Sequence, residues 1–130
     1  MCQHDAARTE QIQRTRFPTL QRVASSEQVW TRVAEKYGVT NPVPPWKTSL
    51  DGMCDALDHT PNGLDPVERR REEDLLSHEV YSDLPYPESQ LVALTHSLLA
   101  KGVIEEELLA RRIEAVRARM HAGAHPSDAE

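Results

Sequence analysis

The stretch YSDLPYPESQLVALTHSLLAKGVIEEELLARRIEAVRARM, residues 81–120, decides the fold class of this chain. Its apolar side chains recur every three or four residues over 87–100 and again over 105–120, which predicts two amphipathic helices. Gly102 follows the first run, at the position where a left-handed residue commonly ends a helix. Acids open the second run and arginines follow, as the helix dipole favours. The segment therefore predicts a C-terminal helical hairpin.

Two further helices are indicated upstream of the hairpin. Asp65, Pro66 and Glu68 mark a helix start, because Asp is a good N-cap, Pro is tolerated at the first position and Glu three residues on completes a capping box. The helix that they open, PVERRREEDLLS, is dense in charge. Residues 47–57 form a shorter helical pattern, whose apolar positions are Leu50, Met53, Cys54 and Leu57.

The N-terminal part of the chain has weaker signals. A helical pattern begins at Ser25 or Ser26 and ends before Gly38, whereas QIQRTRF, residues 11–17, predicts a turn or two at best. Three prolines in VTNPVPPW, residues 39–46, exclude a helix there and favour an extended arm that lies on a partner.

The predicted fold class is therefore all-α, with no sheet. We expect an extended, partner-wrapping arm with one helix over residues 1–47 and a helical domain over 48–121. Residues 122–130 are expected to be a disordered tail.

Composition excludes several classes of function. The chain has 130 residues, of which 38% are hydrophobic, and this is enough for one small domain at most. Its formal net charge is −6 and its bases are interleaved with acids, so no basic stripe is available for nucleic acid. No apolar run approaches 18 residues, and we expect a soluble, cytoplasmic chain.

No catalytic centre or metal site is predicted on this chain alone. His59, His78 and His96 are expected to be ordinary surface or interface residues, because structural and catalytic metal sites need three or four converging ligands. Cys54 lies on an apolar stripe, where a free cysteine behaves as a small hydrophobe. The acidic runs at 72–74 and 105–107 are typical of solvated helix faces.

The cluster Arg69-Arg70-Arg71 allows two interpretations. It is either a solvated run, offset by neighbouring glutamates three or four residues away, or a source of guanidinium donors for oxyanions on a partner. Tyr81 and Tyr86, on either side of Pro85, are either packing residues or the lining of an interface pocket. The residue pattern alone leaves both questions open.

Residues 54–123 resemble the helical N-terminal half of the β subunit of nitrile hydratases. The resemblance is carried by MCDAL, LDPVERRR, the Y-x-x-x-P-Y segment at 81–86 and SLLAKGVIEEELLARRIEAVRARM. It is closest to the separate small subunit that supplies this half in thiocyanate hydrolase and in three-subunit nitrile hydratases. The resemblance implies an enzyme subunit that works only within a heteromeric complex.

In that family, non-corrin cobalt(III) or iron(III) is bound by a cysteine claw on the α-type subunit, and two of the cysteines are oxidised to sulfenate and sulfinate. The resemblance implies that Arg69 and Arg70 bind the oxidised claw of the partner and that Tyr86 lines the substrate pocket. This chain lacks the claw and the C-terminal β-barrel half, which should be a separate subunit. Pro87 and Gln90 replace aromatic residues common in the family's pocket.

These observations predict a small, non-metal-binding subunit of a heteromeric nitrile hydratase, which converts a nitrile and water to an amide. The expected partners are the metal-binding α-type subunit, a separate β-barrel subunit and a small-molecule nitrile, with no nucleic acid or membrane. Two alternatives remain at this point: the β-type subunit of a thiocyanate hydrolase, and a non-catalytic helical adaptor or activator for enzyme maturation.

Overall fold

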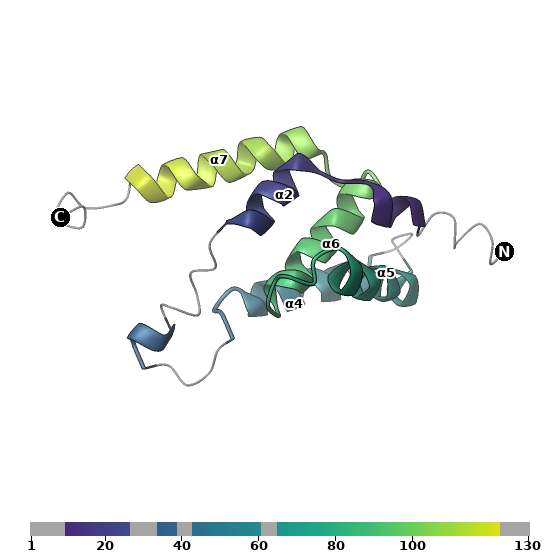
Figure 1. Ribbon diagram of the computed structural model, residues 1–130, viewed down its shortest axis with the longest axis horizontal. Coiled ribbons are helices and arrows are strands. Elements are labelled where there is room, and N and C mark those ends of the chain that lie inside the picture. The colour runs from purple at the N-terminus through teal and green to yellow at the C-terminus, as the bar shows by residue number, and fades with distance from the viewer. Residues whose placement is uncertain (1–9, 27–33, 39–42, 61–64, 123–130) are drawn as a thin grey trace.

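The computed structural model describes residues 10–26, 34–38, 43–60 and 65–122, and within these ranges it is helical with no β-strand. This confirms the all-α prediction (Figure 1). Short helical segments lie at 10–14 and 34–36. The longer helices are α2 (Pro18–Ser25), α4 (Lys47–Asp58), α5 (Pro66–Glu79), α6 (Glu88–Ala100) and α7 (Glu106–Ala122).

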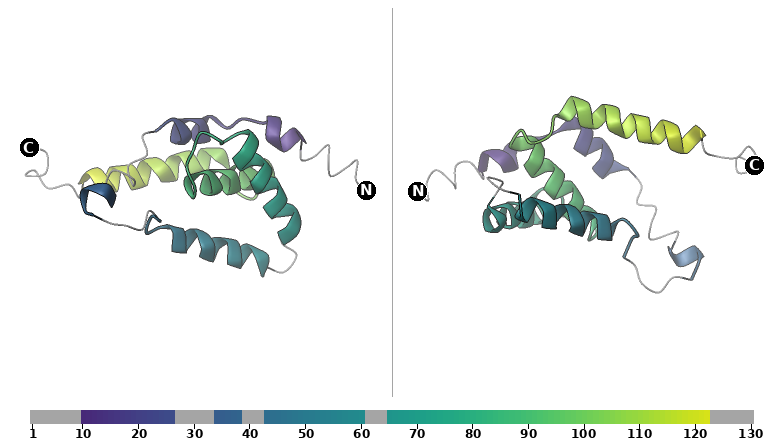
Figure 2. Two further views of the ribbon diagram at one scale, coloured as in Figure 1. Left: turned by 60° about the horizontal axis from the view of Figure 1, so that its bottom comes forward. Right: turned by 180° about the vertical axis from the view of Figure 1, so that it is seen from behind.

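The core lies around α6, which packs mainly against α5 and also contacts α2. Figure 2 shows the arrangement from two further sides. In its right-hand view α4 and α5 lie at one end of α6, and α2 and α7 lie at the other end. The core cluster joins distant parts of the chain, and its buried members are Ile12, Leu20, Leu76, Tyr81, Val92, Ala93 and Leu99. Burial of these apolar side chains is the main favourable contribution to folding.

The predicted boundaries of the central helices are confirmed to within a few residues. A carboxylate oxygen of Asp65 accepts a hydrogen bond from the backbone N–H of Val67 at 3.3 Å, as expected of an N-cap. The helix α5 continues to Glu79, two residues beyond the predicted pattern. Gly102 follows α6 with a φ of +75°, in the left-handed region that only glycine adopts at little cost.

The helix α2 is an addition to the sequence-based picture. Phe17, Leu20, Val23 and Ala24 place apolar side chains three or four residues apart, and Pro18 occupies the first turn, where its missing N–H is harmless. Leu20 is 3% exposed in the core. The pattern was short and was surrounded by polar residues, so a helix here depends on packing against α6 and α7 more than on local propensity.

Both predicted C-terminal helices are present, and they are joined by a short turn. After this turn α7 runs at a steep angle to α6, and its main packing partner is α2 (Figure 1). Ile104 and Leu109, which lie near the start of this helix, both pack partly against the core. None of the residues of α7, all of which the structure describes, is buried.

The prediction that His96 is an ordinary surface or interface residue is wrong. Its side chain is fully buried, with the ring of Phe17 packed edge-on at 5.0 Å. The Nε2 atom lies 2.7 Å from the carbonyl oxygen of Ile12, which can only accept, so Nε2 carries the proton and Nδ1 accepts from the Tyr81 hydroxyl at 2.6 Å. Burial raises the pKa of Tyr81 to about 12 and lowers the pKa of His96, so that the hydroxyl stays protonated and the imidazole neutral.

The expectation of a solvated acidic run at 72–74 is also wrong for two of its members. Glu72 is 2% exposed, because its carboxylate pairs with the Lys101 ammonium at 2.6 Å and accepts a hydrogen bond from the Ser97 hydroxyl at 3.1 Å. Glu73 is buried against Arg69. Ion pairing and hydrogen bonding are what allow charged groups to be buried, and helical periodicity alone does not reveal such partners.

Some sequence-based predictions lie outside the described residues. These are most of the helix predicted to begin at Ser25 or Ser26, which would run through 27–33, and the tail predicted at 122–130 apart from Ala122, which belongs to α7. Ser25 is the last residue of α2, and Ser26 follows it as the C-cap. The helix end at 34–36 and the left-handed Gly38, with a φ of +66°, agree with the prediction. Among the helices within the described residues, none is long and apolar enough to cross a membrane.

Candidate functional site

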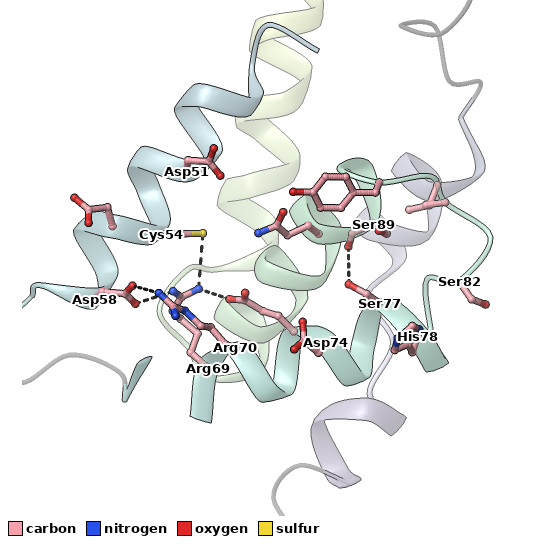
Figure 3. A pocket seen from close by; sticks show the side chains of 15 residues that line it. Asp51, Cys54, Asp58, Arg69, Arg70, Asp74, Ser77, His78, Ser82 and Ser89 are labelled. Atoms are coloured by element: carbon pink, nitrogen blue, oxygen red, sulfur yellow. Dashed lines mark hydrogen bonds and ion pairs between the residues drawn. The ribbon is translucent and has the colours of Figure 1, made fainter. Parts of the chain in front are cut away.

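An open cleft of about 800 Å³ separates α4 from α5 and extends to the first turn of α6 (Figure 3). Its walls come from three helices and from the loop at 82–86. The lining residues that matter for its chemistry are Asp51, Cys54, Asp58, Arg69, Arg70, Glu73, Asp74, Tyr86 and Gln90. Polar and charged side chains make up most of the lining, whereas pockets for apolar small molecules are lined mainly by hydrophobic residues, so the cleft suits a polar or charged group.

Arg69 lies at the base of the cleft and is only 1% exposed. Its guanidinium donates to Asp58 at 2.7 Å and to Glu73 one helical turn away, and a third, weaker contact reaches the Cys54 sulfur at 3.8 Å. Burial would lower the pKa of Arg69, but the hydrogen bond to Asp58 and the charge of Glu73 outweigh it and the pKa is raised. Arg69 is therefore a permanently charged bridge between α4 and α5.

The carboxylate of Glu73 is in a less favourable environment than its contact with Arg69 suggests. Burial raises its pKa, and the opposing attraction of Arg69 only partly offsets this. Arg69 also keeps its Nε buried with no hydrogen-bond partner among the described residues. The buried pair thus has one guanidinium nitrogen without a partner among the described residues and one carboxylate that is costly to keep ionised.

Arg70 differs from its neighbour in exposure. It is 67% exposed at the mouth of the cleft, and its guanidinium donates to the second oxygen of Asp58 at 3.0 Å. Asp58 therefore binds both arginines, and the hydrogen bond from Arg69, aided by Arg70, holds the pKa of Asp58 below its ordinary value. Because Arg70 is exposed and Asp58 also remains paired with Arg69, the Arg70 guanidinium can exchange Asp58 for another anion at little cost.

The two tyrosines on either side of Pro85 have different environments. Tyr81 is a packing residue, since it is 6% exposed and bonded to His96. Tyr86 lines the cleft and is 67% exposed, and the Lys47 ammonium lies 5.6 Å from the centre of its ring. Tyr86 therefore offers an aromatic face and a hydroxyl to whatever enters the cleft.

One polar group in the lining of the cleft has no partner among the described residues. The Gln90 side-chain carbonyl oxygen is buried and unpaired there. Buried polar atoms of this kind are costly and commonly receive a hydrogen bond from water or from a ligand. Gln90 is in the cleft lining, so it is a candidate contact for a bound molecule.

The structure brings together all three residues that the sequence singled out: Arg69, Arg70 and Tyr86 line one cleft. Asp58 and Glu73 were missed as site residues. The four-residue spacing of Arg69 and Glu73 was a usable signal, whereas Asp58 comes from another helix and had none. Cys54 faces the cleft rather than an apolar core, because the Arg69 guanidinium lies beside its sulfur.

No group of three or more His, Cys, Asp and Glu side chains is arranged to hold a metal ion within the described part of the chain. Comparison of the whole chain with protein-family models, with curated proteins and with solved structures found no match. The function of the cleft must therefore be argued from its own geometry together with the sequence resemblance.

Proposed function

We propose that this chain is the small, non-metal-binding subunit of a heteromeric nitrile hydratase, which adds water to a C≡N group to give an amide. Its role is to complete the active site of a metal-bearing α-type subunit, beside a separate β-barrel subunit. The observation that supports the proposal is that Arg69, Arg70 and Tyr86, the residues to which the resemblance assigns a function, line one open cleft.

In this proposal Arg70 is the residue that contacts the partner. Its exposed guanidinium would exchange Asp58 for the oxygens of the oxidised cysteine claw, which are anionic acceptors suited to a bidentate donor. Arg69 would keep α4 and α5 at the right separation, since it is bound on two sides already, and its Nε, which has no partner among the described residues, would be a donor for the partner subunit.

The partner subunit's cobalt(III) or iron(III), when bound, would supply Lewis-acid activation of the nitrile or of the attacking oxygen. Tyr86 and Gln90 would shape the pocket into which the substrate fits. Both line the cleft, and the Gln90 carbonyl, which can only accept a hydrogen bond, lacks a partner among the described residues, so it suits a bound molecule that carries an N–H or O–H donor rather than the C≡N group itself. The amide product is such a molecule.

Co-expression with the genes that neighbour this one is the first test. Purification through a tag on this chain, followed by metal analysis, should give a complex that contains a cobalt- or iron-bearing subunit and converts nitriles to amides. Release of carbonyl sulfide from thiocyanate would identify a thiocyanate hydrolase instead. A chain absent from the active complex would support the adaptor or activator alternative.

The substitution Arg70→Ala tests the role of the cleft directly. We expect the complex to assemble and its turnover to fall by about 10-fold to 100-fold, as is typical when a group supporting the metal ligands is removed. Arg71→Ala is the matched control, since Arg71 is also exposed but lies outside the cleft. Wild-type turnover in the Arg70 variant would rule out the proposed contact with the claw.

A further inference from the structure

The outer half of α7, residues 111–121, is a second surface with unusual properties, and it lies away from the cleft. Figure 1 shows this half of the helix extending past α2, whereas the first turn of α7 lies over the body of the molecule. None of the 17 residues of α7 is buried, and the contacts that anchor the helix lie near its start, where Glu106 accepts a hydrogen bond from the backbone N–H of Thr19 at 3.4 Å and Leu109 packs partly on the core. The apolar face farther along the helix is left exposed.

That apolar face is a narrow seam. Leu109, Ile113, Val116 and Met120 follow one another at spacings of four, three and four residues, the pattern of helices that pack along one another. Leu109 packs partly on the core and Ile113 is half-buried beside α2. Beyond α2 the seam is open, with Val116 43% and Met120 73% exposed.

The seam is bordered by positive charge on both sides. Arg112 and Arg119 precede the apolar positions on one flank, and Arg117 follows on the other. Arg117 pairs with Glu114 at 3.3 Å, but neither Arg112 nor Arg119 has an ion-pair partner within the described residues. Charges at these flanking positions select the partner of a packed helix. The basic flanks stand out on a chain whose net charge is −6.

We propose that the outer half of α7 is a docking surface for an amphipathic helix of another protein, whose apolar seam is flanked by Asp and Glu. The apolar contacts would supply affinity, and the arginines would select the partner by charge. This interface shares no residue with the cleft and does not depend on the proposed function of the cleft.

Two other occupants fit the surface less well. In a pair of α7 helices from two copies of the chain, the arginine flanks would face each other in either orientation, and like charges there oppose pairing. An anionic membrane would be repelled by a chain of net charge −6, and α7 has no aromatic residue of the kind that anchors interfacial helices.

The test uses two synthetic peptides of about three heptads with the same leucine seam, one flanked by Glu and the other by Lys. Each is titrated into the isotope-labelled full chain while the amide signals of α7 are followed by NMR. We expect the Glu-flanked peptide to bind at Val116 and Met120, at least about 10-fold more tightly than its Lys-flanked twin, and more weakly as salt is raised.

Two variants complete the experiment. Val116→Glu should weaken binding of the Glu-flanked peptide by about 10-fold or more, whereas Ala118→Glu, on the opposite side of α7, should leave it unchanged. Equal affinity for the two peptides, or no binding of either, would overturn the proposal. Self-association of the chain, or binding to phosphatidylglycerol vesicles, that Val116→Glu abolishes would overturn it in favour of a second copy or a membrane.

Discussion

The body of this molecule and its outer helix distribute polar and apolar groups in opposite ways. Around α5 and α6 the chain buries charge, with Arg69 1% and Glu72 2% exposed. Along α7 it exposes apolar side chains such as Met120, which is 73% exposed. A buried charge is unfavourable without a counter-charge, and in the body the counter-charges belong to the same chain. An exposed apolar face is unfavourable in water unless another surface covers it.

The buried charges of the body connect helices to each other. Arg69 links α5 to α4 through Asp58, and Glu72 links α5 to Lys101 at the end of α6. Such pairs add little net stability compared with well-packed apolar groups, but they set the geometry of the helices that they join. The cleft between α4 and α5 is therefore held open by polar contacts rather than closed by apolar ones.

The largest expected effect comes from removing the buried charge. Arg69→Ala should lower the free energy of unfolding by about 3–5 kcal/mol, because Glu73 would remain buried without its counter-charge. Arg70→Ala should leave stability nearly unchanged, since that side chain is 67% exposed. Urea unfolding followed by circular dichroism measures both. Similar losses in the two variants would mean that Arg69 is as solvated as its neighbour.

A smaller loss is expected from Tyr81→Phe. The substitution keeps the ring but removes the hydroxyl that donates to His96, and an unsatisfied buried acceptor costs about 1–3 kcal/mol. Tyr37→Phe is the control, because Tyr37 is 72% exposed and its hydroxyl can bond to water. The same unfolding measurement applies, and an unchanged Tyr81 variant would contradict the buried hydrogen bond.

Acid should weaken the body through His96. Burial lowers the pKa of this imidazole in the folded chain, and the nearby Arg16 opposes protonation further, while the carbonyl of Ile12 works the other way. Below about pH 6.5 the unfolded chain therefore takes up this proton first, and stability falls as the pH drops from there toward the folded-state pKa. Above about pH 6.5 His96 is neutral in both the folded and the unfolded chain, so it does not make the stability depend on pH.

Comparison with His96→Gln isolates this effect, because His59, whose pKa the carbonyl of Asp55 raises, titrates in both proteins and cancels in the difference. Gln retains a donor and an acceptor at the same position. The stability difference between the wild type and the variant should depend on pH only below about 6.5. A difference that is flat from pH 5 to pH 8 would show that His96 is not held neutral by burial.

The sequence predicted the helices better than it predicted their contacts. Asp65 with Pro66 and Gly102 act through local backbone chemistry, so the start of α5 and the end of α6 could be read from a few residues. The burial of Glu72 could not be predicted in this way, because its ion-pair partner Lys101 comes from a different part of the chain. His96 was misplaced for the same reason, since its acceptor is on residue 12.

The same difference between local signals and contacts with distant parts of the chain applies to the candidate site. The resemblance assigned a function to Arg69, Arg70 and Tyr86, and all three line the cleft. The carboxylate that binds both arginines, Asp58, had no signal because it comes from the end of α4. The direction of α7 was equally hidden, since the residues of a turn define a helix end but not which helix the next one will contact.

The smallest expected change in the free energy of unfolding is the one that best distinguishes the outer part of α7 from the body. Val116→Glu and Ala118→Glu should each alter the free energy of unfolding by less than about 0.5 kcal/mol, because neither position is buried within the chain. Amide hydrogens beyond Ile113 should also exchange faster than those of α6, since few apolar contacts protect them. A marked loss of stability in the Val116 variant alone would mean that the seam already packs against its own chain. If both substitutions leave the stability unchanged and only Val116→Glu weakens binding of the Glu-flanked peptide, the apolar side chains of the seam serve a partner and not the fold of this chain.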